Sequence, residues 1–453
     1  MAGYGGQRVV VVGAGRTGRS LADFFLRRGA RVILSDSRAA AQLPDCASLV
    51  AQGVVADFGG HSPHLFASAD LVAVSPGVTL TLPVIEAARY RGVPVLGEIE
   101  IAFRELQAPL VGITGTNGKS TTTCLLGEVF RAWGRKTFVG GNLGTPLIEA
   151  VEEDWEWLIA EISSFQLEAV ESFRPRYGLL LNLSPDHLDR YPDMDAYLAA
   201  KQRLFANMTE SDVAVLNGDD PQVLSLAGDA VCRKVLFSSS RSLPQGMSLE
   251  GEHLVWRWRG TERRFNGAEL RLCGRHNREN VMAAMIPPLL EGCPPITVWS
   301  AVCAFGGLDH RMVRVRELDG VAWYDDSKAT NVGSVVKSLD GLAAPVTLIA
   351  GGRDKGGDYA PLAKAAEGKV AHLILIGEAA ERMSRALAGR AVIHRSLSLE
   401  QAVRLARQLT PAGGSVLLSP ACSSFDMFRS YGERGELFIR QVQQLPESAE
   451  EAT

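Results

Sequence analysis

Residues 110–134 read LVGITGTNGKSTTTCLLGEVFRAWG: a short apolar run, a glycine-rich turn and an amphipathic stretch. This order predicts a buried strand that passes directly into a helix, which is the unit of a parallel sheet covered by helices. In the turn, GTNGKS at 115–120 exposes backbone N–H groups to phosphate oxygens, and Lys119 adds a point charge. The usual phosphate loop, GxxxxGK followed by Ser or Thr, needs glycine where this chain has Ile113, so the loop is a shorter variant. A strand-to-helix turn with a chance lysine is the alternative, but the register of glycine, lysine and two hydroxyls favours an ATP site.

The same alternation of strand, turn and helix recurs on both sides of this stretch. RVVVV begins at Arg8 and VTLIAGG at Val346, each followed by helical sequence, whereas residues from about Val231 to Leu272 alternate like antiparallel hairpins. We therefore predict an α/β protein of three domains. A Rossmann-like N-terminal domain spans 1–97, a central P-loop-type ATPase domain with a mostly parallel sheet spans 98–306, and a Rossmann-like C-terminal domain spans 307–453.

Composition limits the class of protein. The chain has 453 residues with 47 Lys and Arg against 51 Asp and Glu, a net charge of −4 that argues against nucleic-acid or anionic-membrane binding. Its seven cysteines form no CxxC pair, which favours a reducing compartment. No apolar run approaches the ~18 residues of a membrane span, and the N-terminus lacks the pattern of a signal peptide. We expect a soluble protein of the cytoplasm.

A second glycine motif, GAGRTG at 13–18, lies between a predicted strand and helix, and Asp36 ends the next strand. The glycines allow a phosphate to approach a helix N-terminus, and a carboxylate at that distance can accept ribose hydroxyls. Three interpretations stay open at this point: an NAD-dependent oxidoreductase, a UDP-linked substrate, or glycines that only pack a strand against a helix. No later stretch offers an obvious hydride-transfer site, which counts against the first.

Transfer of a phosphoryl group also needs metal ligands near the phosphate loop. Glu161 ends the strand WLIAE and His187 follows LLLNLSPD, so both lie at the carboxyl edge where open α/β sheets bind ligands. Lys201 lies on a predicted helix 14 residues beyond His187, and its default interpretation is a solvated surface lysine.

Nine segments in order resemble the Mur ligases of peptidoglycan synthesis: GTNGKST, GGNLG, EISSFQLE, SPDHLDRY, AAKQRLF, GRHNREN, GLDHR, DDSKATN and LSPACSSFDMF. The resemblance runs from GAGRTG to about Glu436. Within the family, DDSKATN (325–331) and SPACSSFDMF (419–428) resemble the members that add D-glutamate. The resemblance implies an ATP-dependent ligase that joins D-glutamate to UDP-N-acetylmuramoyl-L-alanine through an acyl phosphate, acting as a monomer without nucleic acid or membrane insertion. Another Mur ligase or a folylpolyglutamate synthase-like ligase is the alternative, although the latter usually starts near the phosphate loop. A P-loop regulatory or motor protein is a further rival.

The resemblance also implies roles for individual residues. Lys119 and Ser120 would hold phosphates and Mg²⁺, Glu161 would be another metal ligand, and His187 would serve a second Mg²⁺. Lys201 matches the position of a carbamylated lysine that supports the metals, and Asn142 would hold phosphate and substrate. The remaining ATP contacts would be Gly115, Thr116, Asn117, Gly118, Thr121, Asn277, Asn280, Arg311 and Asp326. The UDP half of the substrate would meet Arg16, Thr17, Asp36, Ser37, Arg38, Ser75 and Gly77. D-Glutamate would meet Thr330, Lys328, Lys355, Ser424 and Tyr431, with Lys355 as the cation for its distal carboxylate.

Overall fold

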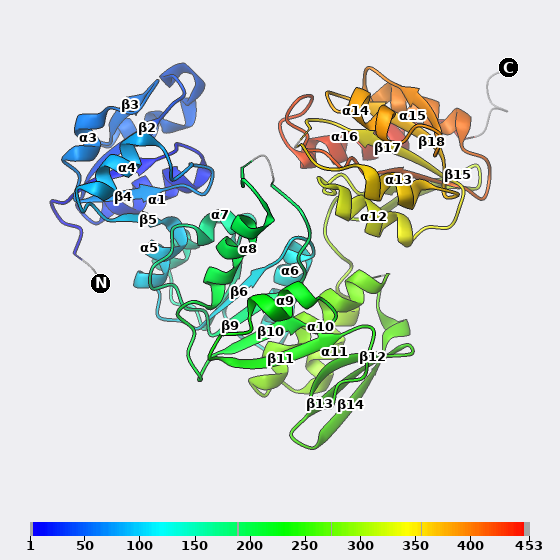
Figure 1. Ribbon diagram of the computed structural model, residues 1–453, viewed down its shortest axis with the longest axis horizontal. Helices are drawn as coiled ribbons and strands as arrows, with labels where there is room; N and C mark the ends of the chain where they lie inside the picture. The colour runs from blue at the N-terminus through cyan, green and yellow to red at the C-terminus, as the bar shows by residue number, and fades with distance from the viewer. Residues whose placement is uncertain (1–2, 188–189, 273, 355, 448–453) are drawn as a thin grey trace. The chain divides into compact units, whose positions relative to one another are not determined.

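The computed structural model describes residues 3–187, 190–272, 274–354 and 356–447 (Figure 1). Over these residues the strands form three sheets, each accompanied by helices (Figure 1). The chain groups into two compact units. The first holds the residues up to Leu183, Asp195–Glu269 and Glu279–Cys303, and the second holds Ser184–Met194, Leu270–Arg278 and the chain from Ala304 onward.

The N-terminal sheet has the order β3-β2-β1-β4-β5, with all neighbours parallel. Its strands are β1 (Arg8–Val12), β2 (Arg31–Asp36), β3 (Val55–Phe58), β4 (Leu71–Val74) and β5 (Val95–Gly97), and its helices are α1 (Arg16–Arg27), α2 (Ala47–Ala51), α3 (Pro63–Ala67) and α4 (Pro83–Tyr90). The valines Val9–Val12 of β1 are fully buried, as the continuous apolar run predicts for a central parallel strand. Because the chain reverses its direction of winding between β1 and β4, a crevice is expected at their carboxyl ends.

The middle sheet has the order β14-β13-β12-β11-β10-β9-β6-β8-β7. Neighbouring strands from β6 to β12 are parallel, the pairs β12–β13 and β13–β14 are antiparallel, and β14 is an edge strand. The strands are β6 (Leu110–Thr114), β7 (Thr137–Gly141), β8 (Trp157–Glu161), β9 (Tyr177–Leu180), β10 (Val213–Asn217), β11 (Arg233–Ser238), β12 (Gly246–Glu250), β13 (His253–Trp258) and β14 (Thr261–Asn266). The α-helices are α5 (Glu98–Glu105), α6 (Lys119–Ala132), α7 (Ser164–Leu167), α8 (Met194–Gln202), α9 (Pro221–Leu226), α10 (Arg275–Leu290) and α11 (Pro295–Ala304).

The C-terminal sheet has the order β15-β16-β20-β17-β18-β19, and only the β15–β16 pair is antiparallel among its described neighbours. The strands are β15 (Val313–Leu318), β16 (Val321–Asp325), β17 (Val346–Gly351), β18 (Val370–Ile376), β19 (Val392–Arg395) and β20 (Ser415–Leu418). The helices are α12 (Val332–Asp340), α13 (Ala360–Ala366), α14 (Ala380–Ala386), α15 (Leu399–Leu409) and α16 (Tyr431–Gln443).

The predicted fold class is confirmed, since three mostly parallel sheets carry helices in the expected order. The hairpins expected between Val231 and Leu272 are β12–β14. The domain boundaries near residues 97 and 306 stay predictions. Among the described residues, no helix combines the length and the apolar character needed to cross a membrane.

Candidate active site

The phosphate loop joins β6 to α6, as the sequence predicts. Lys119 is the first residue of α6, and its Nζ donates to the carbonyl oxygens of Gly115 (2.9 Å) and Thr116 (2.8 Å). The ammonium group therefore lies over the loop and beside the backbone N–H groups that a phosphate chain would meet. Ser120 and Thr121 follow in the first turn of α6, and both residues are buried.

Asn182, which the sequence analysis missed, holds this loop in place. Its carbonyl oxygen accepts from Thr116 N (2.9 Å), its Oδ1 accepts from Asn117 N (2.9 Å), and its Nδ2 donates to Asn117 O (3.0 Å). The residue comes two positions after β9, the neighbour of β6 in the sheet. The sequence feature that could have identified Asn182 is its position as a polar residue directly after the buried run LLL.

The loop also requires glycine at position 118. Gly118 has φ of 87°, and a Cβ there would clash with Asn280 Oδ1. This close approach places Asn280 of α10 against the loop, as its predicted ATP role requires. Asn277 lies on the same helix three residues earlier, and its N–H donates to Gly274 O (3.2 Å).

Glu161 and Asn142 form a pair at the carboxyl edge of the middle sheet. Glu161 is buried at the end of β8, and its Oε1 accepts from Asn142 Nδ2 (2.7 Å). Asn142 directly follows β7, whose Gly141 pairs with Glu161, and Asn142 N donates to Glu161 O (2.8 Å). Because β8 also pairs with β6, this carboxylate lies on the same edge as the phosphate loop.

A magnesium ion fits this donor set. Among the described residues, no group of three or more His, Cys, Asp or Glu side chains could enclose a metal. Mg²⁺ does not need such a cage, since it keeps several waters and takes one or two protein oxygens beside substrate phosphates. The buried Ser120 hydroxyl and Glu161 carboxylate are oxygen donors of the kind it prefers.

Lys201 does not lie in solvent, so its default interpretation as a surface residue is wrong. The side chain is 1% exposed, and its Nζ donates to Gly115 O (3.0 Å) and Thr114 Oγ1 (3.3 Å). The same Nζ lies 4.8 Å from the ring centroid of Tyr197, whose hydroxyl contacts Thr116 Oγ1 at 3.0 Å. Helix α8 thus places the Lys201 side chain in contact with the end of β6 and the phosphate loop.

His187 lies in the segment 184–194, which groups with the second compact unit. Its backbone has φ of 56°, and its Nε2 is 3.7 Å from Asp186 Oδ2. Asp186 in turn accepts from Asn331 Nδ2 (3.3 Å) at the start of α12. The predicted proximity of His187 to Lys119 stays a prediction.

In the second unit, Asp326 is buried directly after β16. It accepts from Ser338 Oγ and Ser419 Oγ, both at 2.7 Å, and burial raises the pKa of its carboxyl to about 6. Arg311 lies near enough to favour its charged form, and Arg311 Nε is buried without a hydrogen-bond partner among the described residues. The neighbouring Asp325 is fully buried against His310, with 2.6 Å between Oδ2 and Nδ1.

The residues predicted for D-glutamate occupy two loops and the start of α16. Ser327 Oγ donates to Tyr431 O (2.8 Å), and Lys328 Nζ lies 5.2 Å from the Tyr431 ring centroid, so the loop after β16 contacts the start of α16. Ser424 is buried on the loop after β20, and Thr330 N donates to Lys328 O (2.9 Å). Lys355 lies outside the residues that the structure describes.

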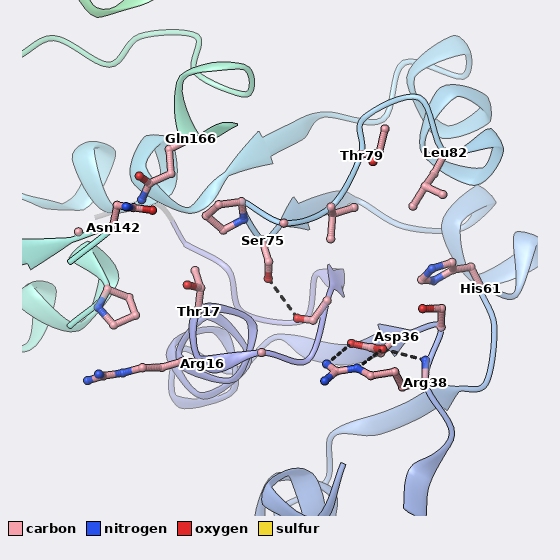
Figure 2. A pocket seen from close by; sticks show the side chains of 18 of the residues that line it. Arg16, Thr17, Asp36, Arg38, His61, Ser75, Thr79, Leu82, Asn142 and Gln166 are labelled. Carbon is pink, nitrogen blue, oxygen red and sulfur yellow. Dashed lines mark hydrogen bonds and ion pairs between the residues drawn. The ribbon is translucent and has the colours of Figure 1, made fainter. Parts of the chain in front are cut away.

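A pocket of about 730 Å³ lies at the carboxyl ends of β1, β2 and β4 and extends to the loops of the middle sheet (Figure 2). It brings together all seven residues predicted for the UDP half of the substrate: Arg16, Thr17, Asp36, Ser37, Arg38, Ser75 and Gly77. The pocket is also lined by Asn142, Gly144 and Pro146, which follow β7, and by Gln166 of α7. Gln166 and His61 are lining residues that the sequence analysis did not identify, because neither belongs to a glycine motif.

Asp36 accepts four hydrogen bonds at one end of this pocket. Arg38 donates to Asp36 from Nε to Oδ1 (3.0 Å), from Nη2 to Oδ2 (2.8 Å) and from its backbone N–H to Oδ1 (2.9 Å; Figure 2). The backbone N–H of Ala14 donates to Oδ2 (2.7 Å). The side-chain bonds from Arg38, which outweigh partial burial, lower the pKa of Asp36 to about 2. With both oxygens engaged, Asp36 holds Arg38 and the turn after β1 in place.

Asn142 lines the pocket of the N-terminal sheet and also contacts Glu161, which lies on the same sheet edge as the phosphate loop. The chain belongs to the Mur ligase family. Family models match it over residues 7–97 (Mur ligase MurD-like, N-terminal domain), 113–287 (Mur ligase middle domain) and 310–422 (Mur ligase, glutamate ligase domain).

Among curated relatives, it is 65% identical over 446 residues to the UDP-N-acetylmuramoylalanine--D-glutamate ligase of Syntrophotalea carbinolica, covering 98% of this chain and 99% of that protein. It is 50% identical over 446 residues to the enzyme of that name from Geotalea uraniireducens, covering 98% of each. Among solved structures, it resembles a pseudomurein peptide ligase type C from Methanothermus fervidus (TM-score 0.63, 18% identity, 97% of this chain and 100% of that chain). It also resembles the UDP-N-acetylmuramate-alanine ligase of Thermotoga maritima (TM-score 0.59, 20% identity, 96% and 99%). The two structures bear on the fold alone.

Proposed function

We propose that this protein joins D-glutamate to UDP-N-acetylmuramoyl-L-alanine at the expense of ATP, as a step of peptidoglycan precursor synthesis in the cytoplasm. The observation that carries the proposal is the position of Asn142. It lines the pocket that holds the predicted UDP contacts, and its amide donates to Glu161 at the edge of the ATP loop. A substrate whose nucleotide occupies the pocket therefore has its other end directed toward the phosphates. This direction is what transfer of a phosphoryl group to the substrate requires.

The chemistry follows from the acceptor. The alanine carboxylate of the UDP substrate is a poor acyl donor. One of its oxygens therefore first attacks the γ-phosphorus of ATP, which gives an acyl phosphate and ADP. The amine of D-glutamate then attacks the acyl carbon, and the tetrahedral intermediate expels phosphate to leave an amide. Lys119, with the loop N–H groups, stabilises the charge that spreads over the phosphoryl oxygens, the term that dominates such reactions.

Magnesium, when bound, neutralises phosphate charge. Ser120 and Glu161 are the residues proposed to hold it, and Asn142 orients the Glu161 carboxylate. A second ion at His187 and a carbamate on Lys201 are also part of the proposal. The nearby charge of Lys119 supports the latter, because the Nζ atoms of Lys119 and Lys201 both donate to Gly115 O and an anionic carbamate on Lys201 would offset that charge.

The C-terminal loops are proposed to bind D-glutamate through Thr330, Lys328, Lys355, Ser424 and Tyr431. Asn277, Asn280, Arg311 and Asp326 are proposed to contact adenosine and its phosphates. In this assignment residues 1–97, 98–306 and 307–453 are the UDP-substrate, ATP and amino-acid domains of a monomer.

The test is an ADP-release assay with ordered addition. The expected result is release of ADP only when UDP-N-acetylmuramoyl-L-alanine is present, with full turnover after D-glutamate is added last. L-Glutamate, L-lysine and meso-diaminopimelate in place of D-glutamate are the controls that separate sister ligases. A folate substrate separates a folylpolyglutamate synthase. ADP release that ignores the UDP substrate would contradict the proposal.

A further inference from the structure

Glu98, the first residue of α5, is a buried acidic residue that takes no part in the proposed chemistry. Its Oε1 accepts from Ile148 N at 2.7 Å, across 50 positions of the chain. Ile148 is the second residue of the 3₁₀ helix η3 (Leu147–Glu152), which directly follows Pro146, a residue that lines the pocket of the N-terminal sheet. Glu98 therefore contacts the segment into which a pocket-lining loop continues.

Glu98 supplies a cap that η3 lacks in its own sequence. The N-cap position of η3 is Pro146, which makes no side-chain cap hydrogen bond. The first N–H groups of a helix have no partner within the helix, and a carboxylate is a strong acceptor for them. Ile148 N donates to Glu98, and Leu147 N lies near enough to lower the pKa of the carboxyl. The start of η3 is therefore held by a residue of α5 rather than by its own loop.

Glu98 also lies close to Gln166, a residue of α7 that lines the pocket (Figure 2). The Gln166 side chain is near enough to lower the pKa of the Glu98 carboxyl. Gln166 Oε1 accepts from Ser163 N (2.9 Å) and Ser163 Oγ (3.0 Å), which leaves its NH₂ group to interact with Glu98. The second carboxyl oxygen, Oε2, is buried and makes no hydrogen bond with the described residues, so it can accept from this NH₂ group.

The loop between β7 and η3 is thereby held at both ends. At its start, Asn142 Nδ2 donates to Glu161 Oε1 (2.7 Å), and at its end Pro146 leads into the turn that Glu98 caps. Asn142, Gly144 and Pro146 of this loop line the pocket. Loss of the cap would free the end of the loop that is remote from Glu161, and so would alter the pocket wall without removing a contact of the phosphate loop.

The contacts of Glu98 are not explained by a contribution to stability. Burial raises the pKa of its carboxyl to about 7, above the value of about 4.5 for an exposed glutamate. The folded state therefore disfavours the ionised carboxyl, and Glu98 costs stability as the pH rises through this range.

We propose that Glu98 is a positioning residue for the UDP substrate, which it affects through the loop 142–146 and Gln166 without touching the substrate. The inference rests on the proposed function, because it supposes that the substrate occupies this pocket. A wall that is held in its binding conformation before the substrate arrives favours binding, since less order has to be gained in the complex.

Glu100 provides a matched control on the same helix. It is fully buried and accepts from three backbone N–H groups of a distant segment, those of Glu171 (2.9 Å), Ser172 (3.0 Å) and Phe173 (2.9 Å). These three described residues are not among those that line the pocket. Glu100 thus resembles Glu98 in burial and in the kind of contact, but its contacts lead away from the pocket.

The test compares the steady-state kinetics of full-length Glu98→Met, Glu98→Gln and Glu100→Gln with those of the wild type. Glu98→Met fills a similar volume and has no oxygen acceptor, whereas Glu98→Gln can still accept from Ile148 N. The KM for the UDP substrate is measured at saturating ATP and D-glutamate, and the KM for ATP at saturating UDP substrate and D-glutamate. Thermal melts show whether each variant is folded.

Glu98→Met is expected to raise the KM for the UDP substrate about tenfold, because it removes a hydrogen bond to a charged group, and to leave the KM for ATP within about twofold. Glu98→Gln should recover part of this loss, with a rise of about threefold, because its bond to Ile148 N is a neutral one. Glu100→Gln should melt at a lower temperature than the wild type yet keep both KM values.

A folded Glu98→Met with the wild-type KM for the UDP substrate would overturn the positioning role. An equal rise in both KM values, or the same change in Glu100→Gln, would also overturn it. If Glu98→Met does not fold, Glu98→Gln decides the question, and a wild-type KM for the UDP substrate in that variant would overturn the role. A wild type that releases no ADP in the presence of the UDP substrate would instead contradict the proposed function, and this inference with it.

Discussion

Asn182→Ala should weaken ATP binding without disturbing the UDP pocket. The substitution removes the bond from Asn117 N to Oδ1 (2.9 Å) and the bond from Nδ2 to Asn117 O (3.0 Å), while the backbone bond from Thr116 N remains possible. At about 1 kcal/mol of net stabilisation for each bond, the loop loses about 2 kcal/mol of support for its binding conformation. If that whole cost falls on the nucleotide complex, the KM for ATP rises roughly thirtyfold, because about 1.4 kcal/mol is a factor of ten.

Asn207→Ala is the matched control for this measurement. Asn207 is also partly buried, and its Nδ2 donates to two backbone carbonyls, Glu171 O (2.7 Å) and Phe173 O (3.2 Å), away from the phosphate loop. Initial rates with varied ATP at saturating UDP substrate and D-glutamate give KM, and thermal melts give the loss of stability. The two variants should lose similar stability, and only Asn182→Ala should raise the KM for ATP. A change below twofold, or an equal change in both variants, would refute the assignment of Asn182 as the clamp of the loop.

Three further outcomes are expected. Lys119→Ala should lose ADP formation while its melting curve stays close to that of the wild type, because the ammonium acts on charge that develops during transfer; activity within tenfold of the wild type would rule out this role. Asp36→Ala with Arg38→Ala should raise the KM for the UDP substrate and leave that for ATP nearly unchanged, and equal effects on both constants would count against the pocket assignment. Glu98 is 1% exposed, and burial raises its pKa to about 7, with partial relief from the Ile148 N–H at 2.7 Å. Because the folded-state pKa is the higher one, stability falls as the pH rises from about 4.5 to about 7, by up to about 3 kcal/mol from this group. Urea unfolding at pH 5 and pH 8 should show a smaller pH dependence and greater stability at pH 8 for Glu98→Gln, and identical curves for variant and wild type would contradict this.

Sequence patterns predicted the parts of the site that depend on local chain chemistry. The glycine turns after β1 and β6 combine a strand, a left-handed glycine and a helix start within ten residues, so their chemistry is readable in one stretch. The seven residues predicted for the UDP half all line one pocket, because they follow the carboxyl ends of β1, β2 and β4. Strand order was not readable, since β9 lies beside β6 although β7 and β8 come between them in the chain.

Contacts between distant segments account for what was missed. Asn182 binds a loop 65 residues earlier, and His61 reaches Ser35 across 26 positions, distances at which no periodicity applies. The default interpretation of Lys201 as a surface lysine was wrong for the same reason: its helix looks polar at that position, but the side chain is buried and contacts the phosphate loop. The roles assigned to the site residues, His187 and Lys355 among them, remain predictions.

The edge strand β14 affects how readily the protein aggregates. An exposed sheet edge is a template on which a strand of another molecule can add, and a nine-stranded sheet leaves such an edge at its antiparallel end. Residues 261–264 of β14 are all exposed, and Glu262 there accepts from Arg257 Nε and Arg264 Nε, both at 2.8 Å. A strand from another molecule would have to remove water from these charged side chains before it could form backbone hydrogen bonds with β14. The charged residues of the β13–β14 hairpin therefore disfavour aggregation through this edge of the sheet.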